Sequence, residues 1–382
     1  MSVSIKPLIQ GLCLASFTLA GICAAHEVAH DSAEGHTDDG PHFERAKSDG
    51  KVIITGGAKT PYLWESDWLK LPEQREWLGS THGCIVTDAK DNVFLSADSG
   101  DAIQVFDKHG NFVRSFGADW GAGVHGLSIV TEAKEVITES EGMTENVGVL
   151  VEALFVAHTA KQRVFKTTLT GEVLLELEFP TASGKYENRA SYKPTSVAVA
   201  PDGRLFVADG YGLSWIHIYS ADGIYLSSFG GPGEGPENLR TPHGLWLDTH
   251  GETPTLLVSD RENHRIARFS LDGKFLGGTD PESGLLRRPC HLQFAGDVAV
   301  VADLAGRVTL LNEKLELITH LGDNPDATQH ANFGVTPDKW RDGAFLAPHC
   351  ARIDSAGNLL VMDWNVAGRI TRLVPLFRIE GE

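Results

Sequence analysis

The stretch Thr241-Pro242-His243-Gly244-Leu245-Trp246-Leu247 places a histidine between a Thr-Pro pair and an alternating apolar run. Such a run is typical of a β-strand, so the histidine opens a predicted strand. Two further stretches repeat the arrangement: Gly123-Val124-His125-Gly126-Leu127-Ser128-Ile129 and Ala347-Pro348-His349-Cys350-Ala351-Arg352-Ile353. One strand opening that recurs at wide spacing predicts an array of structural repeats.

A longer unit surrounds each of these strands. A turn of the Pro-Asp-Gly type follows the first strand, and then come an apolar strand that ends in aspartate, a third strand, and a fourth strand that ends near Phe-Gly. The clearest copy runs from Pro194 to Gly230. Six first strands open at His82, His125, Thr195, His243, Cys290 and His349, and six second strands end at Asp98, His158, Asp209, Asp260, Asp303 and Asp363.

Six repeats of about 40–50 residues, each with four short strands, predict an all-β fold, a six-bladed β-propeller with four-stranded blades. At 382 residues and 42% hydrophobic composition, the chain has enough apolar residues for a large core. The last repeat is one strand short. We therefore expect a strand near Lys51-Val52-Ile53-Ile54 to join it and close the ring, which leaves no long unpaired sheet edge.

The N-terminal region is interpreted as two segments that precede the propeller of residues 51–382. Residues 1–25 resemble a secretory signal, with Lys6, the apolar run Leu8–Ile22, and small residues before the cleavage site. Residues 26–50 are polar and predict a disordered leader. Capture of zinc or copper by its histidines is the alternative: His26, His30, His36 and His42. The sequence thus predicts a secreted or periplasmic protein.

The charge balance limits the choice of partners. The formal net charge is −18, from 51 acidic and 33 basic residues, which argues against binding to nucleic acid or to anionic membranes. The apolar run in the signal is short for a membrane span, so we expect no membrane insertion after its removal. Cys84, Cys290 and Cys350 all lie near predicted first strands. We interpret them as small buried apolar residues, with a disulfide or a ligand role as the alternative.

Three histidines form the candidate metal site. In a propeller the first strand of every blade lines the central channel, so residues in equivalent positions form a ring around the axis. His125, His243 and His349 occupy one register in the second, fourth and sixth blades. Their threefold arrangement suits zinc and leaves a fourth position for water or substrate, as in catalytic sites. The alternative is that they form hydrogen bonds around a water-filled channel.

Other histidines are expected to play supporting roles. His82 has the same register in the first blade, and we expect it to line the channel or to lie behind the ligands. His291 is displaced by one residue from the register and should point away from the axis. His158 ends a second strand and is interpreted as structural.

Two loop residues are candidates for catalysis. Tyr211 follows Asp209-Gly210, and a phenol near zinc can serve as a base. Arg261 follows Asp260 in the matching loop of the next blade, and its planar guanidinium suits a carboxylate. Each is equally well explained as a loop residue that packs on its neighbours. The aspartates that recur at the ends of second strands indicate a turn-stabilising role in the scaffold.

The repeats resemble NHL repeats, and several motifs together resemble peptidyl-α-hydroxyglycine α-amidating lyase. The similarity covers about Thr81 to the C-terminus and is densest between Lys193 and Phe269. The motifs are Pro194-Thr195 with Val197-Ala198-Val199, Phe206-Val207-Ala208-Asp209-Gly210-Tyr211, Pro242-His243, Asp260-Arg261-Glu262-Asn263 with Arg265-Ile266, and Pro348-His349.

The resemblance implies a six-bladed propeller whose axial zinc is held by His125, His243 and His349. It also implies a reaction that splits a C-terminal α-hydroxyglycine into a peptide amide and glyoxylate. Zinc would hold the substrate hydroxyl, Tyr211 would take its proton, and Arg261 would fix the substrate or balance charge. The implied partner is a small-molecule or peptide substrate with hydroxyl and carboxylate groups.

The sequence departs from the family at two places. The segment Phe94-Leu95-Ser96-Ala97-Asp98-Ser99-Gly100-Asp101 has no arginine where the family carries a second one in its active site. The family's structural Ca²⁺ is associated with an aspartate after the last zinc histidine, and Cys350 in that place argues against calcium. Three hypotheses follow: a lyase-like enzyme with an altered substrate, a non-catalytic NHL propeller that binds a protein, peptide or small ligand, and a metal-binding protein whose leader delivers ions.

Overall fold

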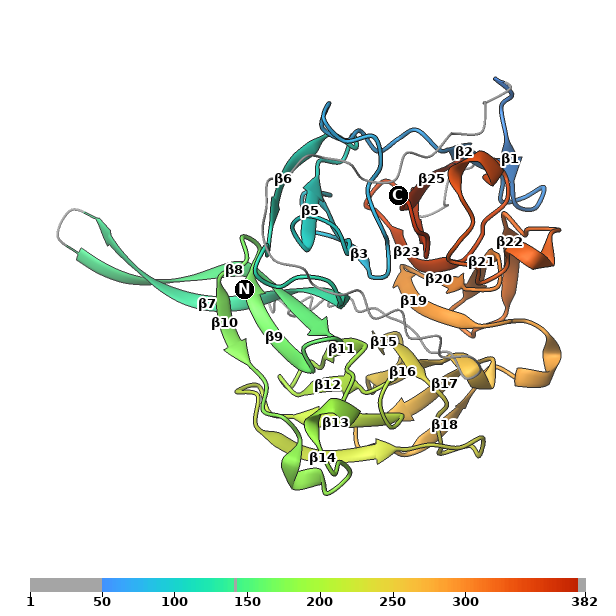
Figure 1. Cartoon of the computed structure of the whole chain (residues 1–382). Coiled ribbons are helices and arrows are strands. Elements are labelled where there is room, and N and C mark those ends of the chain that lie inside the picture. Colours follow the sequence, from blue (N-terminus) through green and yellow to red (C-terminus); the bar gives the residue numbers. More distant parts are fainter. Residues whose placement is uncertain (1–49, 141–142, 377–382) are drawn as a thin grey trace, which may run out of the picture.

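The computed structural model describes residues 50–140 and 143–376, and these form six antiparallel sheets. Figure 1 shows the sheets arranged in a ring, which confirms the predicted six-bladed propeller. The predicted signal, and the leader up to residue 49, lie outside the described residues. Within the described part of the chain, no helix combines the length and the apolar character that a membrane span requires.

Five sheets have four strands each, and in each of them the strands follow one another along the chain from the axis outward. The first blade contains β3 (Ile85–Thr87), β4 (Val93–Ser96), β5 (Ile103–Phe106) and β6 (Phe112–Phe116). The second contains β7 (Val124–Ser140), β8 (Met143–His158), β9 (Arg163–Thr168) and β10 (Val173–Glu176). The third contains β11 (Ser196–Val199), β12 (Leu205–Ala208), β13 (Trp215–Tyr219) and β14 (Tyr225–Gly230).

The fourth blade contains β15 (Pro242–Asp248), β16 (Thr255–Asp260), β17 (Arg265–Ser270) and β18 (Phe275–Gly278). The fifth contains β19 (Pro289–Ala295), β20 (Val298–Asp303), β21 (Arg307–Asn312) and β22 (Leu317–Leu321). The sixth contains β23 (Pro348–Ile353), β24 (Leu359–Asp363) and β25 (Arg369–Pro375), completed by β2 (Tyr62–Glu65) and β1 (Ile54–Thr55). Short 3-10 helices lie in the connections: η1 (Thr181–Ser183), η2 (Arg189–Ser191), η3 (Arg261–Asn263), η4 (Pro281–Ser283), η5 (Ala327–Gln329) and η6 (Pro337–Lys339).

The N-terminal part of the propeller closes the ring, as predicted, but through a different strand. β2 pairs with β25, and β1 adds a fifth strand at the outer edge. Of the predicted segment near residues 51–54, only Ile54 joins this sheet, and it pairs with Leu63 of β2 instead of with β25. Burial explains the choice, because Tyr62 and Trp64 are only 3% and 6% exposed, whereas Val52 is 75% exposed.

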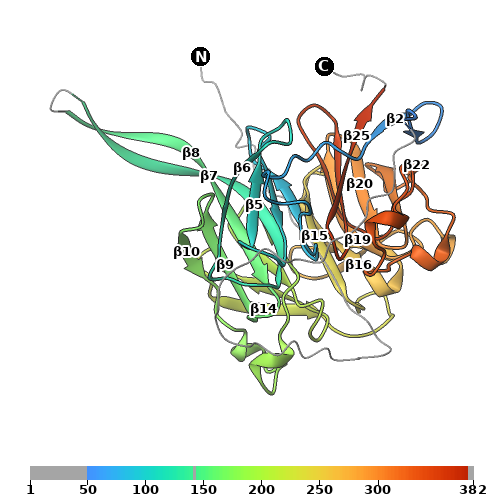
Figure 2. The same ribbon diagram turned by 45° about the horizontal axis from the view of Figure 1, so that its top comes forward.

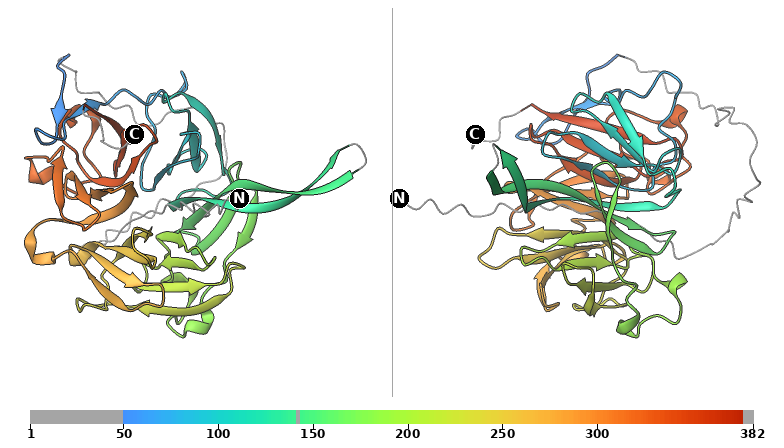
Figure 3. Two further views of the ribbon diagram at one scale, coloured as in Figure 1. Left: turned by 180° about the vertical axis from the view of Figure 1, so that it is seen from behind. Right: turned by 90° about the vertical axis from the view of Figure 1, so that its left-hand side faces the viewer.

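The second blade differs from the prediction of short strands. β7 and β8 have 17 and 16 residues, and their pairing continues to Ser140 and Met143. Figures 2 and 3 show this hairpin as an arm that extends beyond the ring. From Leu127 to Glu141 the sequence has no glycine, proline or asparagine, so no turn signal ends β7 at the usual length.

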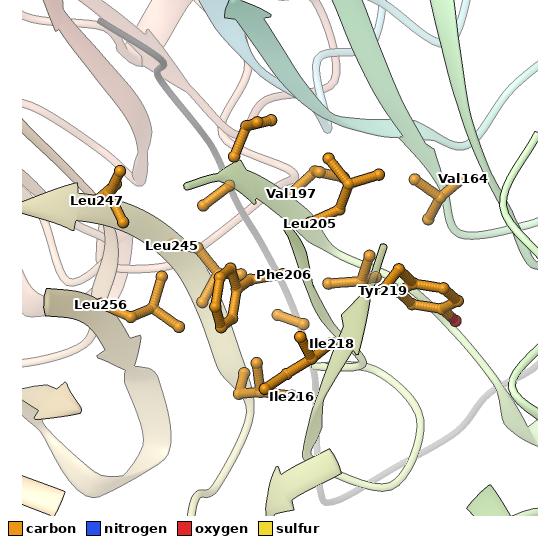
Figure 4. Packing of buried hydrophobic residues seen from close by; sticks show 14 of the residues in the cluster. Val164, Val197, Leu205, Phe206, Ile216, Ile218, Tyr219, Leu245, Leu247 and Leu256 are labelled. Atoms are coloured by element: carbon orange, nitrogen blue, oxygen red, sulfur yellow. The ribbon is translucent and has the colours of Figure 1, made fainter. Parts of the chain in front are cut away.

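Apolar contacts between neighbouring sheets hold the ring together. All four residues of β12 are buried, because both faces of a blade are covered by its neighbours. Figure 4 shows Phe206 of β12 packed near Leu245 and Leu256 of the next blade. Burial of one such side chain stabilises the fold by about 1.5–3 kcal/mol.

The recurring aspartates fix the chain at the start of the inner strands. Asp260 accepts hydrogen bonds from the backbone N–H of Arg240 at 2.7 Å and from Nε of Arg265 at 2.8 Å. Asp363 accepts from the backbone N–H groups of Leu346 and Ala347 at 3.0 and 2.8 Å. These bonds hold the segments just before two candidate metal ligands, as expected for a scaffold role.

Candidate metal centre

Each predicted metal ligand lies in a β-bulge at the start of an inner strand. The pairing shifts between Val124 and Gly126, between Pro242 and Leu245, and between Pro348 and Cys350. The histidine of each blade lies inside this shift. Bulges are known to redirect a side chain near functional sites, and the same shift also occurs in the fifth blade, between Pro289 and His291.

The three predicted ligands, His125, His243 and His349, converge although they are far apart in the chain. The distance between ring centroids is 6.1 Å for His125 and His243, 5.7 Å for His125 and His349, and 5.6 Å for His243 and His349. Their exposed fractions are 0–1%. The structure thus brings the three rings together in a dry site.

Backbone carbonyl groups orient the three rings. Nδ1 of His125, His243 and His349 lies 3.2, 2.7 and 2.7 Å from the carbonyl oxygens of Thr195, Cys290 and Gly83, respectively. Since a carbonyl oxygen only accepts, Nδ1 carries the proton and Nε2 carries the lone pair. A histidine that donates its other N–H to a carbonyl is the usual arrangement of a metal ligand.

The imidazoles are also kept neutral. Burial lowers the pKa of His125, His243 and His349 well below the usual range, and neighbouring imidazoles and the charge of Arg261 lower it further. A neutral imidazole is the form that binds a metal.

His82 lies beside the candidate ligands, although it was expected only to line the channel or to lie behind them. Its ring centroid is 5.3 Å from that of His125 and 5.7 Å from that of His349. One nitrogen from each of His82, His125 and His349 lies within 4.8 Å of the other two. The structure therefore places four histidines around the axis.

Tyr211 stands over the same group. Its loop is held by a bond from the Gly210 N–H to Oγ1 of Thr195 at 3.3 Å and by one from its own N–H to the carbonyl of Lys193, also at 3.3 Å. Its ring centroid is 5.0 Å from that of His125, and its hydroxyl oxygen is 3.4 Å from Nε2 of His82. The predicted catalytic tyrosine is thus next to the histidines.

Arg261 brings a buried positive charge to the site. Its side chain is 0% exposed, and its Nε donates to Oε1 of Glu262 at 2.7 Å. The charge of Arg261 contributes to the lowered pKa of all four histidines, after the effect of burial. It is therefore close enough to act on an anion bound near them.

His291 and His158, which were not predicted as ligands, make contacts of their own. His291 is buried, and its Nδ1 is 3.4 Å from the backbone nitrogen of Ala351. His158 donates from Nε2 to the carbonyl of Trp120 at 2.8 Å, a structural contact. Cys84, Cys290 and Cys350 are all fully buried free thiols, as expected.

Aromatic side chains that no sequence motif indicated form one side of the site. The ring of Trp364 is 6.1 Å from His82 and 5.0 Å from Phe333, and Trp340 packs in the same apolar cluster as Tyr211. Trp364 directly follows Asp363, just as Arg261 follows Asp260. This shared position in the repeat was the available signal.

The donor set fits zinc better than calcium. The group of described residues that could hold an ion consists of imidazoles, and imidazole suits zinc and other transition metals. Calcium takes six to eight oxygen ligands. The imidazoles present therefore fit zinc, although the group of nitrogens that lie within 4.8 Å of one another contains His82, His125 and His349 and does not include His243.

Comparisons with known proteins agree with the fold. Residues 193–282, which include Tyr211, His243 and Arg261, match a family model described as a 6-bladed beta-propeller. The solved "Streptogramin B lyase structure" superposes with a TM-score of 0.51 at 14% identity, and the match covers 82% of this chain and 98% of that chain. This likeness concerns the fold alone.

Two curated relatives carry amidating names. The chain is 42% identical over 76 residues to Peptidyl-alpha-hydroxyglycine alpha-amidating lyase 2 of Drosophila melanogaster, which is 19% of this chain and 18% of the relative. It is 33% identical over 127 residues to Peptidylglycine alpha-amidating monooxygenase of Rattus norvegicus, which is 32% of this chain and 12% of the relative. The chain thus spans less than a fifth of these relatives. It is a six-bladed β-propeller that is similar, over part of its length, to proteins named as α-amidating lyases and monooxygenases.

Proposed function

We propose that this protein is a zinc-dependent lyase of the amidating type, which cleaves a C-terminal α-hydroxyglycine or a related hydroxylated substrate with a carboxylate. The observation that carries the proposal is the convergence of His125, His243 and His349 with Tyr211 beside them. The name of the partial relative from Drosophila melanogaster, an alpha-amidating lyase, supports the same reaction.

The candidate residues would hold the metal ion and move the proton of the substrate. His125, His243 and His349 would hold zinc through Nε2, and the bound ion supplies a Lewis acid for a substrate oxygen. As a phenolate, Tyr211 would accept the proton of the substrate hydroxyl. The C–N bond then breaks as the C=O bond of glyoxylate forms, and Tyr211 returns the same proton to the leaving amide nitrogen.

Arg261 serves the anionic part of the substrate. Its Nε is engaged by Glu262, and its charge reaches all four histidines. A guanidinium in a dry site stabilises a carboxylate more strongly than it would in water. Arg261 therefore balances the charge that gathers at the site.

The test is the release of glyoxylate from an α-hydroxyglycine peptide by the purified, zinc-loaded protein. Tyr211→Phe should keep the metal and lose about 10²–10⁴-fold in kcat, the usual contribution of a positioned acid or base. Tyr225→Phe is the matched control, because the Tyr225 hydroxyl contacts Ser228 on the outer strand of the third blade. Zinc-bound protein that releases no glyoxylate would overturn α-hydroxyglycine as the substrate, and full activity in Tyr211→Phe would overturn the assigned base.

The second candidate is a non-catalytic propeller that binds a ligand on one face. It is favoured by the first blade, where Ser99 and Gly100 follow Asp98 and residues 94–101 contain no arginine. Ser99 instead donates to the carbonyl of Leu78 at 3.1 Å. Metal analysis after removal of the leader separates the two candidates, since about one zinc per chain is expected only for the metal-dependent lyase.

Export is part of the proposal. The predicted signal of residues 1–25 would direct the protein to a secreted or periplasmic location. N-terminal sequencing of the mature protein should begin near His26, and a retained Met1 would contradict export.

A further inference from the structure

His82 is a residue of the first blade that breaks the threefold pattern of the site. The other two odd-numbered blades present Thr195 and Cys290 at the matching position. His82 lies three residues before β3, and its side chain is 32% exposed, whereas the other three histidines are buried. It is thus an extra imidazole at the open side of the group.

The two nitrogens of His82 face different partners. Nδ1 lies 3.9 Å from Oδ2 of Asp98, and Nε2 lies 3.4 Å from the hydroxyl oxygen of Tyr211. Asp98 is itself fixed, because its Oδ1 accepts the backbone N–H of Gly123 at 2.9 Å. A carboxylate near Nδ1 favours the proton there and leaves the lone pair on Nε2.

The distances between the candidate ligand atoms also favour His82 as a metal ligand. Among the described residues, the group whose nitrogens lie within 4.8 Å of one another consists of His82, His125 and His349. His243 lies outside this group, with its ring centroid 6.1 Å from that of His125 and 5.6 Å from that of His349. Zinc–nitrogen bonds of about 2.0–2.1 Å place tetrahedral ligand atoms about 3.4 Å apart, so the rings have to move closer together when the ion binds. A carboxylate behind a histidine is a common partner of metal ligands.

We infer that His82 is a fourth imidazole donor to the same ion, oriented by Asp98. The inference rests on the metal site of the proposed function and adds a residue of this chain to it. A tetrahedral ion held by four imidazoles has no place left for a substrate. Because His82 is the most exposed of the four histidines, it would control how readily the metal site binds a substrate.

The test counts imidazoles on the bound metal. Zinc is loaded into the full protein, into His82→Phe, and into His109→Gln, an exposed turn histidine that serves as the control. X-ray absorption should give four imidazoles for the wild type and the control, and three nitrogen ligands plus a light atom for His82→Phe. Competition with a chelator should show a loss in zinc affinity of at least about 10-fold for His82→Phe, since even outer partners of ligands contribute that much.

A second variant guards against misfolding. Asp98→Asn leaves all four imidazoles in place, and it should weaken zinc binding less than His82→Phe does. Thermal unfolding of the zinc-free proteins establishes that each variant is folded. Equal affinity and three imidazoles in both wild type and His82→Phe would overturn the inference and leave the proposed lyase intact. A wild type that binds no zinc would overturn both.

Discussion

The substitution Arg261→Gln tests how the buried charge is held. The side chain of Arg261 is 0% exposed, and its Nε forms an ion pair with Oε1 of Glu262 at 2.7 Å. The side chain of Glu262 is 24% exposed, and its Oε1 also accepts a hydrogen bond from Nη2 of Arg288 at 2.5 Å. The substitution therefore removes one of the two guanidinium groups that pair with the partly buried carboxylate of Glu262.

The magnitude follows from that arrangement. Removing one partner of a fully buried ion pair costs about 3–5 kcal/mol, because the other charge stays buried without compensation. Here Glu262 keeps Arg288 and some contact with water, so we expect a loss of about 2–3 kcal/mol in the free energy of unfolding. Arg204→Gln is the matched control. It removes a surface arginine paired with Asp202 and Asp272, and it should cost less than about 1 kcal/mol.

Urea unfolding of the zinc-free proteins, followed by tryptophan fluorescence, measures both changes. A zinc-free comparison excludes stabilisation by the metal. If Arg261→Gln costs no more than Arg204→Gln, the buried ion pair does not stabilise the fold and the reasoning is wrong. In the glyoxylate assay, Arg261→Gln should lose at least about 30-fold in kcat/KM, the equivalent of 2 kcal/mol.

Three further predictions concern the scaffold. Gly210→Ala should lower the urea midpoint, since a Cβ there would lie 2.3 Å from the carbonyl oxygen of Pro242; Gly251→Ala, whose nearest contact is 3.7 Å, should leave the midpoint unchanged. Trp64→Ala should cost about 3–5 kcal/mol of unfolding free energy, because Trp64 is 6% exposed and its ring lies 4.5 Å from that of Phe345; a cost near zero would mean that β2 does not close the ring. In His250, burial lowers the pKa, but the hydrogen bonds of Nδ1 to Asp248 and of Nε2 to the carbonyl of Gly296 outweigh it and raise the pKa above 6.5. The stabilisation by protonated His250 is therefore present below pH 6.5 and is lost as the pH rises through the raised pKa. His250→Gln should lower the free energy of unfolding by up to about 1 kcal/mol at pH 5.5 and by less at pH 8.5. An equal loss at both pH values would contradict this.

The blade count was predictable because turn signals recur at regular spacing in the sequence. Turns such as Asp222-Gly223 and Asp272-Gly273 mark where strands end, and local chemistry decides them. Where the signal is missing, as between Leu127 and Glu141, the sequence did not reveal that β7 and β8 continue as a long hairpin. The closing strand was misplaced because both the segment at 51–54 and the one at 62–65 are apolar, and only tertiary packing selects the second.

The convergence of His125, His243 and His349 was predictable only through the fold, since equal register in alternate blades places them around one axis. The sequence does not show the bulges that hold them, because a bulge depends on the pairing of two strands. The closeness of His82 depends on the path of the chain before β3. Its relation to Asp98 and Tyr211 joins two blades, and no local pattern encodes it.

The most direct test of the account is an anomalous diffraction map of the zinc-loaded protein, collected at the zinc absorption edge. We predict one strong peak on the axis, about 2.0–2.1 Å from Nε2 of each of His125, His243 and His349. A map without a peak among these three rings, or with its peak only on residues of the leader, would contradict the central claim.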